Sequence, residues 1–204
     1  MCAIVNAAGN SVPPVFVFPR ARFHDHMLKG APNGSIELAN SPTNGWMTSQ
    51  LFVKVLDHLQ KYSRSTTNDP ILLLLDNHES HCSIDAIKFC RENGIVLLTF
   101  PPHCTHKLQP LDVSVIGPFK KKLSLSQNDW LLNNPKKTIT IHDLPSIVTP
   151  AYNNSFTPGQ VSEQQGSFPF HEMFVVMKTS IVVKLLKGSL IPQKCLNHQY
   201  QETL

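Results

Sequence analysis

The sequence predicts an α/β domain, from two apolar strands, the helix between them and the composition. The apolar runs 71–75 and 95–100 flank a helical segment at 83–93, which is the order of a right-handed crossover unit. Hydrophobic residues make up 41% of the 204 residues, enough to bury a core, whereas only 16% are charged and 16 are proline. That composition argues against a helical bundle or coiled coil. The length suits one domain, or one domain with a tail.

The first part of the chain is predicted to contain two neighbouring strands, a loop and a helix. Strands at 2–5 and 15–18 are separated by turn residues and are expected to form a hairpin. Residues 20–45 are expected to be a loop, because glycine and proline recur along them. Thr48 can cap a helix that ends near Tyr62. Its apolar residues share one helical face: Leu51, Phe52, Val55, Leu56 and Leu59.

The run at 71–75 consists of five aliphatic residues followed at once by an acid, which indicates a strand buried on both faces. Ser83 can cap the next helix, which is expected to continue through Asn93 and to stop at Gly94. The side chains expected to face inward from this helix are Ile84, Ile87 and Cys90.

The last part of the chain is less regular. Pro101 and Pro102 are expected to end the strand at 95–100. Residues 111–125 are predicted to form a helix interrupted by Gly117 and Pro118. The apolar stretch 173–186 is expected to be an amphipathic helix or an unrelated tail, and it is too short and too charged to cross a bilayer.

The positive charge is concentrated in one segment. The chain has 18 basic and 14 acidic residues, a net charge of +4. Residues 107–137 contain six lysines against Asp112 and Asp129, so this segment alone accounts for the excess. Five cysteines without a CxxC pair fit reduced thiols in the cytosol or nucleus better than a secreted disulfide framework. The N-terminus lacks the features of a signal peptide.

Two acids follow the two most apolar predicted strands. Asp76 comes directly after 71–75, and Asp112 follows 95–100 by a short loop. Adjacent parallel strands bring such residues to one edge of the sheet. Paired carboxylates there can hold Mg²⁺, and two such ions would activate a water and stabilise the leaving oxygen of a phosphodiester.

The sequence around these acids resembles the DDE superfamily endonuclease domain of pogo- and Tigger-type transposases and of domesticated relatives such as jerky and centromere protein B. The most specific segments are LLLDNH at 73–78 and PPHCTHKLQPLD at 101–112. Other matching segments follow the family's order: 8–18, 45–47, 93–95 and 118–120.

The resemblance implies a ribonuclease H-like (DDE transposase/integrase) fold that cuts and joins DNA with Mg²⁺ or Mn²⁺. It implies that Asp76 is the second catalytic acid and metal ligand, and that Asp112 is the third. The family's first acid lies on a strand upstream of the segment that matches 1–20, so we expect this chain to lack that strand. Residues 1–158 are expected to be the partial domain and 159–204 a divergent C-terminal tail.

Polar residues near the two acids are interpreted through the same motifs. They are expected to form hydrogen bonds around the acidic edge and lie next to DNA: Asn77, His78, His81, His103, His106 and Gln109. A zinc site that also uses Cys82 and Cys104 is an alternative, although the spacing matches no common zinc finger. The lysines expected to contact phosphates are Lys107, Lys120, Lys121 and Lys122.

The leading hypothesis is a nuclear, transposase-derived domain that binds DNA and has lost cleavage because its first acid is absent. The alternative is a domesticated DNA- or protein-binding module without chemistry, and a third possibility is a decayed gene copy. Neither a membrane nor a small-molecule substrate is expected as a partner.

Overall fold

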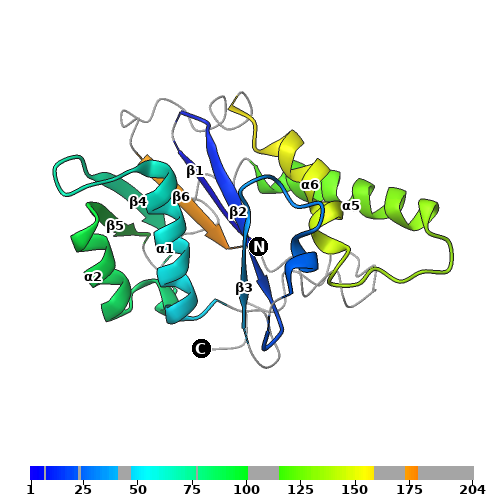
Figure 1. The fold of residues 1–204 in the computed structure, drawn as a ribbon. Coiled ribbons are helices and arrows are strands. Elements are labelled where there is room, and N and C mark those ends of the chain that lie inside the picture. Colours follow the sequence, from blue (N-terminus) through cyan, green and yellow to red (C-terminus); the bar gives the residue numbers. More distant parts are fainter. Residues whose placement is uncertain are drawn as a thin grey trace, which may run out of the picture.

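A computed structural model describes residues 1–6, 8–22, 24–40, 47–76, 78–100, 115–158 and 173–178. These residues build a six-stranded sheet in the order β3-β2-β1-β6-β4-β5, with helices packed on both faces (Figure 1). The architecture confirms the predicted α/β class and is consistent with a ribonuclease H-like fold.

The strands fall into two groups on either side of the middle of the sheet. On one side lie β1 (Cys2–Asn6), β2 (Ser11–Phe18) and β3 (Ile36–Ala39). On the other lie β4 (Ile71–Leu75) and β5 (Ile95–Thr99). β1 and β2 form the predicted antiparallel hairpin, and β4 and β5 are parallel as the crossover requires.

Two strands were not predicted. β3 is parallel to β2 and lies inside the segment predicted as a loop. β6 (Met173–Lys178) lies between β1 and β4, antiparallel to the first and parallel to the second. The prediction of a helix is therefore wrong for 173–178, where an apolar run that includes two valines fills a position in the interior of the sheet.

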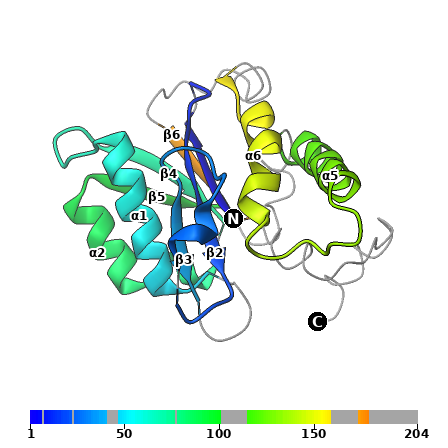
Figure 2. The same cartoon turned by 45° about the vertical axis from the view of Figure 1, so that its right-hand side comes forward.

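The helices form the outer layers of the molecule (Figures 1 and 2). α1 (Ser49–Ser63) and α2 (Ile84–Glu92) pack on one face, and α5 (Ile116–Asn133) and α6 (Leu144–Ser155) pack on the other. Two short 3₁₀ turns, η1 (Asp25–Leu28) and η2 (Glu79–His81), complete the described elements.

The predicted helix caps are present. The Thr48 hydroxyl accepts a hydrogen bond from the Leu51 amide at 3.3 Å, and the Ser83 hydroxyl accepts one from the Ala86 amide at the same distance. Gly94 follows α2 with a φ of 65°, where a side chain would collide with the backbone around Thr66.

α5 is longer than predicted at its C-terminal end. The glycine and proline expected to interrupt it lie in its first turn, and proline is tolerated there because the amide needs no intrahelical partner. The helix then continues to Asn133 rather than stopping near Leu125. Residues 111–114 lie outside the described part of the chain.

The core consists of two apolar layers, one on each face of the sheet. Alternate residues of β1, β2 and β4 enter opposite layers, as the period of a strand requires, whereas Val96 and Leu98 on one face of β5 are exposed. Ala3 and Val5 of β1 pack with α5 and α6, whereas Cys2 and Ile4 pack with α1 and α2. The alternation continues through β2 and β4, which are covered on both faces.

One part of the α2 prediction is wrong. Ile84 is 72% exposed and Ile87 is 38% exposed, so neither faces inward. Ala86 and Cys90, one helical turn apart, are the buried residues instead. The inward face of α2 is therefore rotated from the predicted one, and its buried side chains are the small Ala86 and Cys90.

Candidate metal centre and nucleic-acid interface

Asp76 lies where the sequence predicted, immediately after the buried strand β4. β4 is parallel to both of its neighbours, β5 and β6, so the carboxyl ends of three strands meet at this edge of the sheet. The chain then turns through η2, and the Asp76 side chain remains 31% exposed. This is the edge at which α/β sheets collect functional groups.

His81 brings a ring nitrogen to the Asp76 carboxylate. Its Nδ1 is 2.8 Å from Asp76 Oδ1, and its side chain is 2% exposed. The ring stacks on Phe52 of α1, with the centroids 4.3 Å apart. Among the described residues neither Oδ1 nor Nδ1 has a further hydrogen-bond partner, and the close pair is not aligned well enough to count as a full hydrogen bond. His81 is therefore fixed by packing, and the Asp76 carboxylate lies against it.

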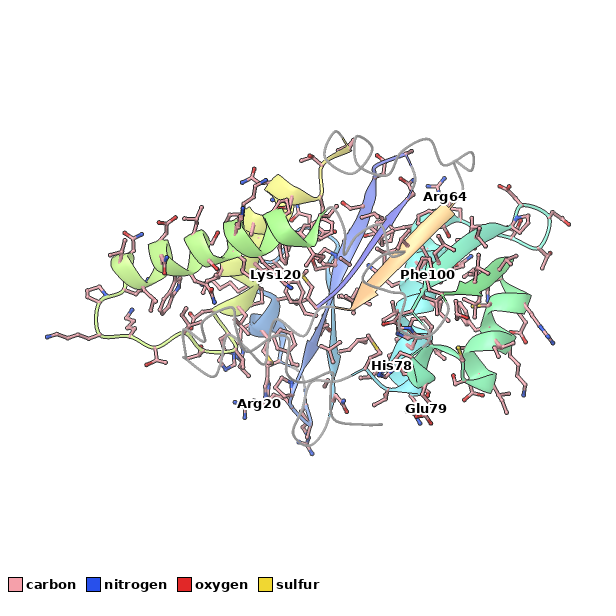
Figure 3. All side chains as sticks on the ribbon, turned by 180° about the vertical axis from the view of Figure 1, so that it is seen from behind. Arg20, Arg64, His78, Glu79, Phe100 and Lys120 are labelled. Carbon is pink, nitrogen blue, oxygen red and sulfur yellow. The ribbon has the colours of Figure 1, made fainter. Side chains whose placement is uncertain are left out.

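His78 shapes the turn that carries His81. Its Nδ1 accepts a hydrogen bond from the Ser80 amide at 3.3 Å and lies 2.8 Å from the Ser80 hydroxyl. These contacts begin η2, and the His78 and His81 rings are 5.6 Å apart. Figure 3 shows His78 and Glu79 together at this end of the molecule. Both histidines thus lie near the Asp76 end of β4.

The pKa of the Asp76 carboxyl is lowered. Burial, the largest single influence, would raise this pKa. The contact with His81, the positive charge of His81 and His78, and a hydrogen bond from the His78 backbone together outweigh burial. Asp76 is therefore an ionised carboxylate at neutral pH, the form that binds a hard cation.

The lysines on α5 divide into two kinds. Lys120 and Lys121 are exposed, whereas Lys122 is half-buried and its ammonium donates to the Asn154 carbonyl in the last turn of α6. A cation at that position satisfies a terminal carbonyl and interacts favourably with the helix dipole. Figure 3 places Lys120 on the half of the molecule away from His78 and Glu79.

Most of the chain matches a known family. The family model described as DDE superfamily endonuclease matches residues 1–164. The chain belongs to this superfamily. Its members generally use divalent metals, and the family implies DNA as a substrate.

A curated relative of this DDE domain has a name from a different class of protein. A protein named "MFS-type transporter clz9" from Cochliobolus lunatus is 29% identical over 181 residues, which cover 87% of this chain and 20% of that protein. The chain therefore spans about a fifth of the length of that relative. No solved structure matches the chain significantly. Within the described residues, none of the helices is both long and apolar enough to cross a membrane.

Of the two predicted metal ligands, Asp76 is the one that lies among the described residues. Its carboxylate is ionised and partly exposed at a strand end, the form in which a carboxylate can bind a hard cation. Across the described ranges, histidines, cysteines and acids form no group of three that could hold a metal ion. Asp112, the predicted second carboxylate, lies in 101–114, outside those ranges.

Several other predicted site residues of the DDE domain also lie outside the described residues. They are Asn77, His103, His106, Lys107 and Gln109. The zinc alternative depends in part on His103, His106 and Cys104, which fall in the same segment.

Sequence reasoning missed the role of Phe52. It was assigned to the apolar face of a helix, and it is fully buried there, but its ring also supports the His81 imidazole. Helical periodicity alone does not reveal such a contact, because His81 lies in a separate element, the turn η2.

A pocket of about 600 Å³ lies between α2 and β5. Its walls are largely apolar, and they include Ile87, Cys90, Ile95 and Leu97. Burial raises the pKa of the Cys90 thiol to about 12, so this thiol is not a nucleophile at neutral pH. The lining also includes Thr99, which pairs with Leu75, and Cys82, which follows His81, so the pocket extends to the Asp76 end of the sheet.

Proposed function

We propose that this DDE-family domain binds DNA and that its strand-cleaving activity has been lost. The observation that carries the proposal is an ionised Asp76, held against the buried His81, at a strand end whose two neighbouring strands bring no acid. β5 has the sequence IVLLT and β6 has MFVVMK. A two-metal centre needs carboxylates that bridge both ions, and Asp76 and Asp112 are the two acids proposed for this site.

A divalent ion at this site would be held by Asp76 together with Asp112, and we propose Mg²⁺ or Mn²⁺. The ion would supply charge neutralisation and an activated water at a phosphodiester. The residues of the chain itself would do the rest: His81 positions the Asp76 carboxylate, and Phe52 fixes the orientation of the His81 ring.

The proposed DNA contact uses the exposed lysines Lys120 and Lys121 of α5, together with Lys107. Lysines that neutralise phosphates release counterions, so the affinity should fall steeply with salt. A nuclear location and a place among the pogo- and Tigger-type relatives belong to the same proposal. They are supported by the motifs around Asp76 and Asp112 and by the cysteine usage.

Cleavage can be tested with supercoiled plasmid, Mn²⁺ and the purified chain beside its Asp76→Asn variant. We expect both proteins to leave the plasmid intact at equal levels. Nicking by the wild-type chain that disappears in Asp76→Asn would show that cleavage is retained.

DNA binding can be tested separately by fluorescence anisotropy at several salt concentrations. Replacing both Lys120 and Lys121 by alanine should reduce the slope of log affinity against log salt by about 2, or about 1 for each phosphate contact. Lys54→Ala is the matched control, because Lys54 is exposed on α1, on the other face of the sheet. Equal losses in both variants would contradict a specific role for α5.

The second candidate is a domesticated binding module for DNA or protein that never performs chemistry. The acid-free strands on both sides of Asp76 favour it. Salt-dependent DNA binding without nicking supports a DNA-binding module, whereas the absence of DNA binding at low salt leaves protein as its partner.

A further inference from the structure

β5 is an outer strand of the described sheet. Among the described strands β4 alone pairs with it, in parallel (Figure 1). At one end of this pair the Ile71 amide donates to the Gly94 carbonyl, and at the other end the Phe100 amide donates to the Leu75 carbonyl. Successive residues of a strand turn their backbone groups to opposite sides. The amide and carbonyl of Leu97, an odd number of residues from both 94 and 100, therefore point away from β4.

The side chains of these outward-facing residues lie beside the pocket between α2 and β5. Ile95 is buried in the layer of α1 and α2, and Leu97 packs against that layer. Both residues line the pocket, together with Ile87 and Arg91 of α2. No residue of β4 contributes to the described lining. The pocket therefore lies toward the open edge of β5, on the α2 face of the sheet.

The opposite face of β5 is apolar as well. Val96 and Leu98 are both more than half exposed. α5 and α6 lie over the other half of the sheet, so neither of them covers this face of β5 (Figure 2). An outer strand with apolar side chains and unpaired backbone groups is a template on which another strand can add.

The charge beside this edge is positive. Arg91 is the charged residue in the described lining of the pocket, and the acids of α2, Asp85 and Glu92, do not line it. Arg91 is exposed and forms no salt bridge with a described residue. It lies in the last turn of α2, shortly before β5 begins. A carboxylate placed beside the beginning of β5 would therefore meet its guanidinium group.

We propose that the outer edge of β5 binds an extended, acidic peptide segment of a partner protein as an additional antiparallel strand. Its alternate apolar side chains enter the pocket, and a carboxylate at its C-terminal end pairs with Arg91. The antiparallel direction is favoured because antiparallel ladders are slightly more stable per residue than parallel ones. The surface includes neither Asp76 nor the lysines of α5, so this inference goes beyond the proposed function.

The antiparallel pairing predicts which backbone groups of the peptide are needed. A residue opposite Leu97 exchanges both backbone hydrogen bonds with it and places its side chain on the same face, toward the pocket. The peptide residues whose side chains enter the pocket are therefore those whose amides bind β5. The amides of the intervening residues point to solvent.

The pairing can be tested with the full chain and a fluorescein-labelled peptide. The peptide consists of three valine–threonine pairs followed by a glutamate, and fluorescence anisotropy in EDTA measures its binding. We expect binding to be abolished by N-methylation of the valine amides and preserved after N-methylation of the threonine amides. The proposal is wrong if the unmodified peptide does not bind, if both methylated peptides behave alike, or if only the threonine amides are needed.

The role of Arg91 can be tested by charge reversal. Arg91→Glu should weaken binding of this peptide about fivefold and strengthen binding of a peptide that ends in lysine instead of glutamate. Arg20→Glu is the matched control, because Arg20 is exposed after β2, in the other half of the sheet (Figure 3). Circular dichroism checks that both variants are folded. Equal effects of the two variants would show that the acidic peptide is attracted by the net charge alone and would contradict the proposal.

Light scattering distinguishes a peptide partner from a second copy of this chain. The proposal expects the peptide to bind without changing the oligomeric state of the protein. If the peptide instead dissociates a dimer, the edge of β5 is an interface between two copies, and the assignment of a partner peptide is wrong.

Discussion

The Asp76 end of β4 and the lysine surface of α5 differ in how their functional groups are held. At Asp76 the carboxylate lies against a buried histidine, which in turn stacks on a buried phenylalanine. On α5, Lys120 and Lys121 extend from an exposed helix face, and only Lys122 is fixed, by a carbonyl of α6. The first region depends on packing, so single substitutions there should affect stability. The second acts through charge, so its effects should be additive and salt-dependent.

The largest effect should come from Phe52→Ala. Phe52 is fully buried between α1 and the sheet, and truncation of such a ring costs about 3–5 kcal/mol of unfolding free energy. It would also remove the surface on which the His81 ring stacks. Urea unfolding followed by circular dichroism measures the loss, and Ile84→Ala, at a residue 72% exposed, should change stability by less than about 0.5 kcal/mol. Similar losses in both variants would show that this end of the sheet is not tightly packed.

A smaller loss is expected from His81→Phe. This change keeps an aromatic ring against Phe52 but removes the nitrogen that faces Asp76, leaving a half-buried carboxylate without its partner. We expect a loss of about 1–2 kcal/mol. In the His81→Phe background, Asp76→Asn should cost less than it does in the wild-type protein, and a double-mutant cycle from urea unfolding measures that coupling. Additive losses would mean that the 2.8 Å approach contributes nothing.

The lowered pKa of Asp76 predicts how this coupling depends on pH. The pKa is below 3.8 in the folded chain and near 3.8 in the unfolded chain, so the ionised form stabilises the fold. That stabilisation is complete above about pH 5 and is lost as the pH falls through the folded pKa. The stability difference between wild type and Asp76→Asn should therefore be larger at pH 5 than at pH 3. If the stability difference between the two proteins grew on acidification, folding would raise the pKa of Asp76 rather than lower it.

Much of this architecture was predictable because its signals are local. Five aliphatic residues before Asp76, the caps Thr48 and Ser83, and the motif at 73–78 each define an element or a site from neighbouring residues. The position of β6 was not predictable in this way. An apolar run such as MFVVMK is compatible with a helix or a strand, and only the open edges of β1 and β4 select the strand. The contact between His81 and Phe52 was equally invisible, since it joins elements distant in sequence.

The smallest effects should distinguish two adjacent lysines. Lys122→Ala removes the donor to Asn154 at the end of α6 and should cost about 0.5 kcal/mol of stability. Lys121→Ala, one residue away on the exposed face, should cost less stability than Lys122→Ala does, because its side chain has no such contact. In the DNA-binding assay the order should be reversed, with a clear loss of affinity for Lys121→Ala and little for Lys122→Ala. If both lysines affected stability and DNA binding equally, the division between a structural and a DNA-facing side of α5 would be wrong.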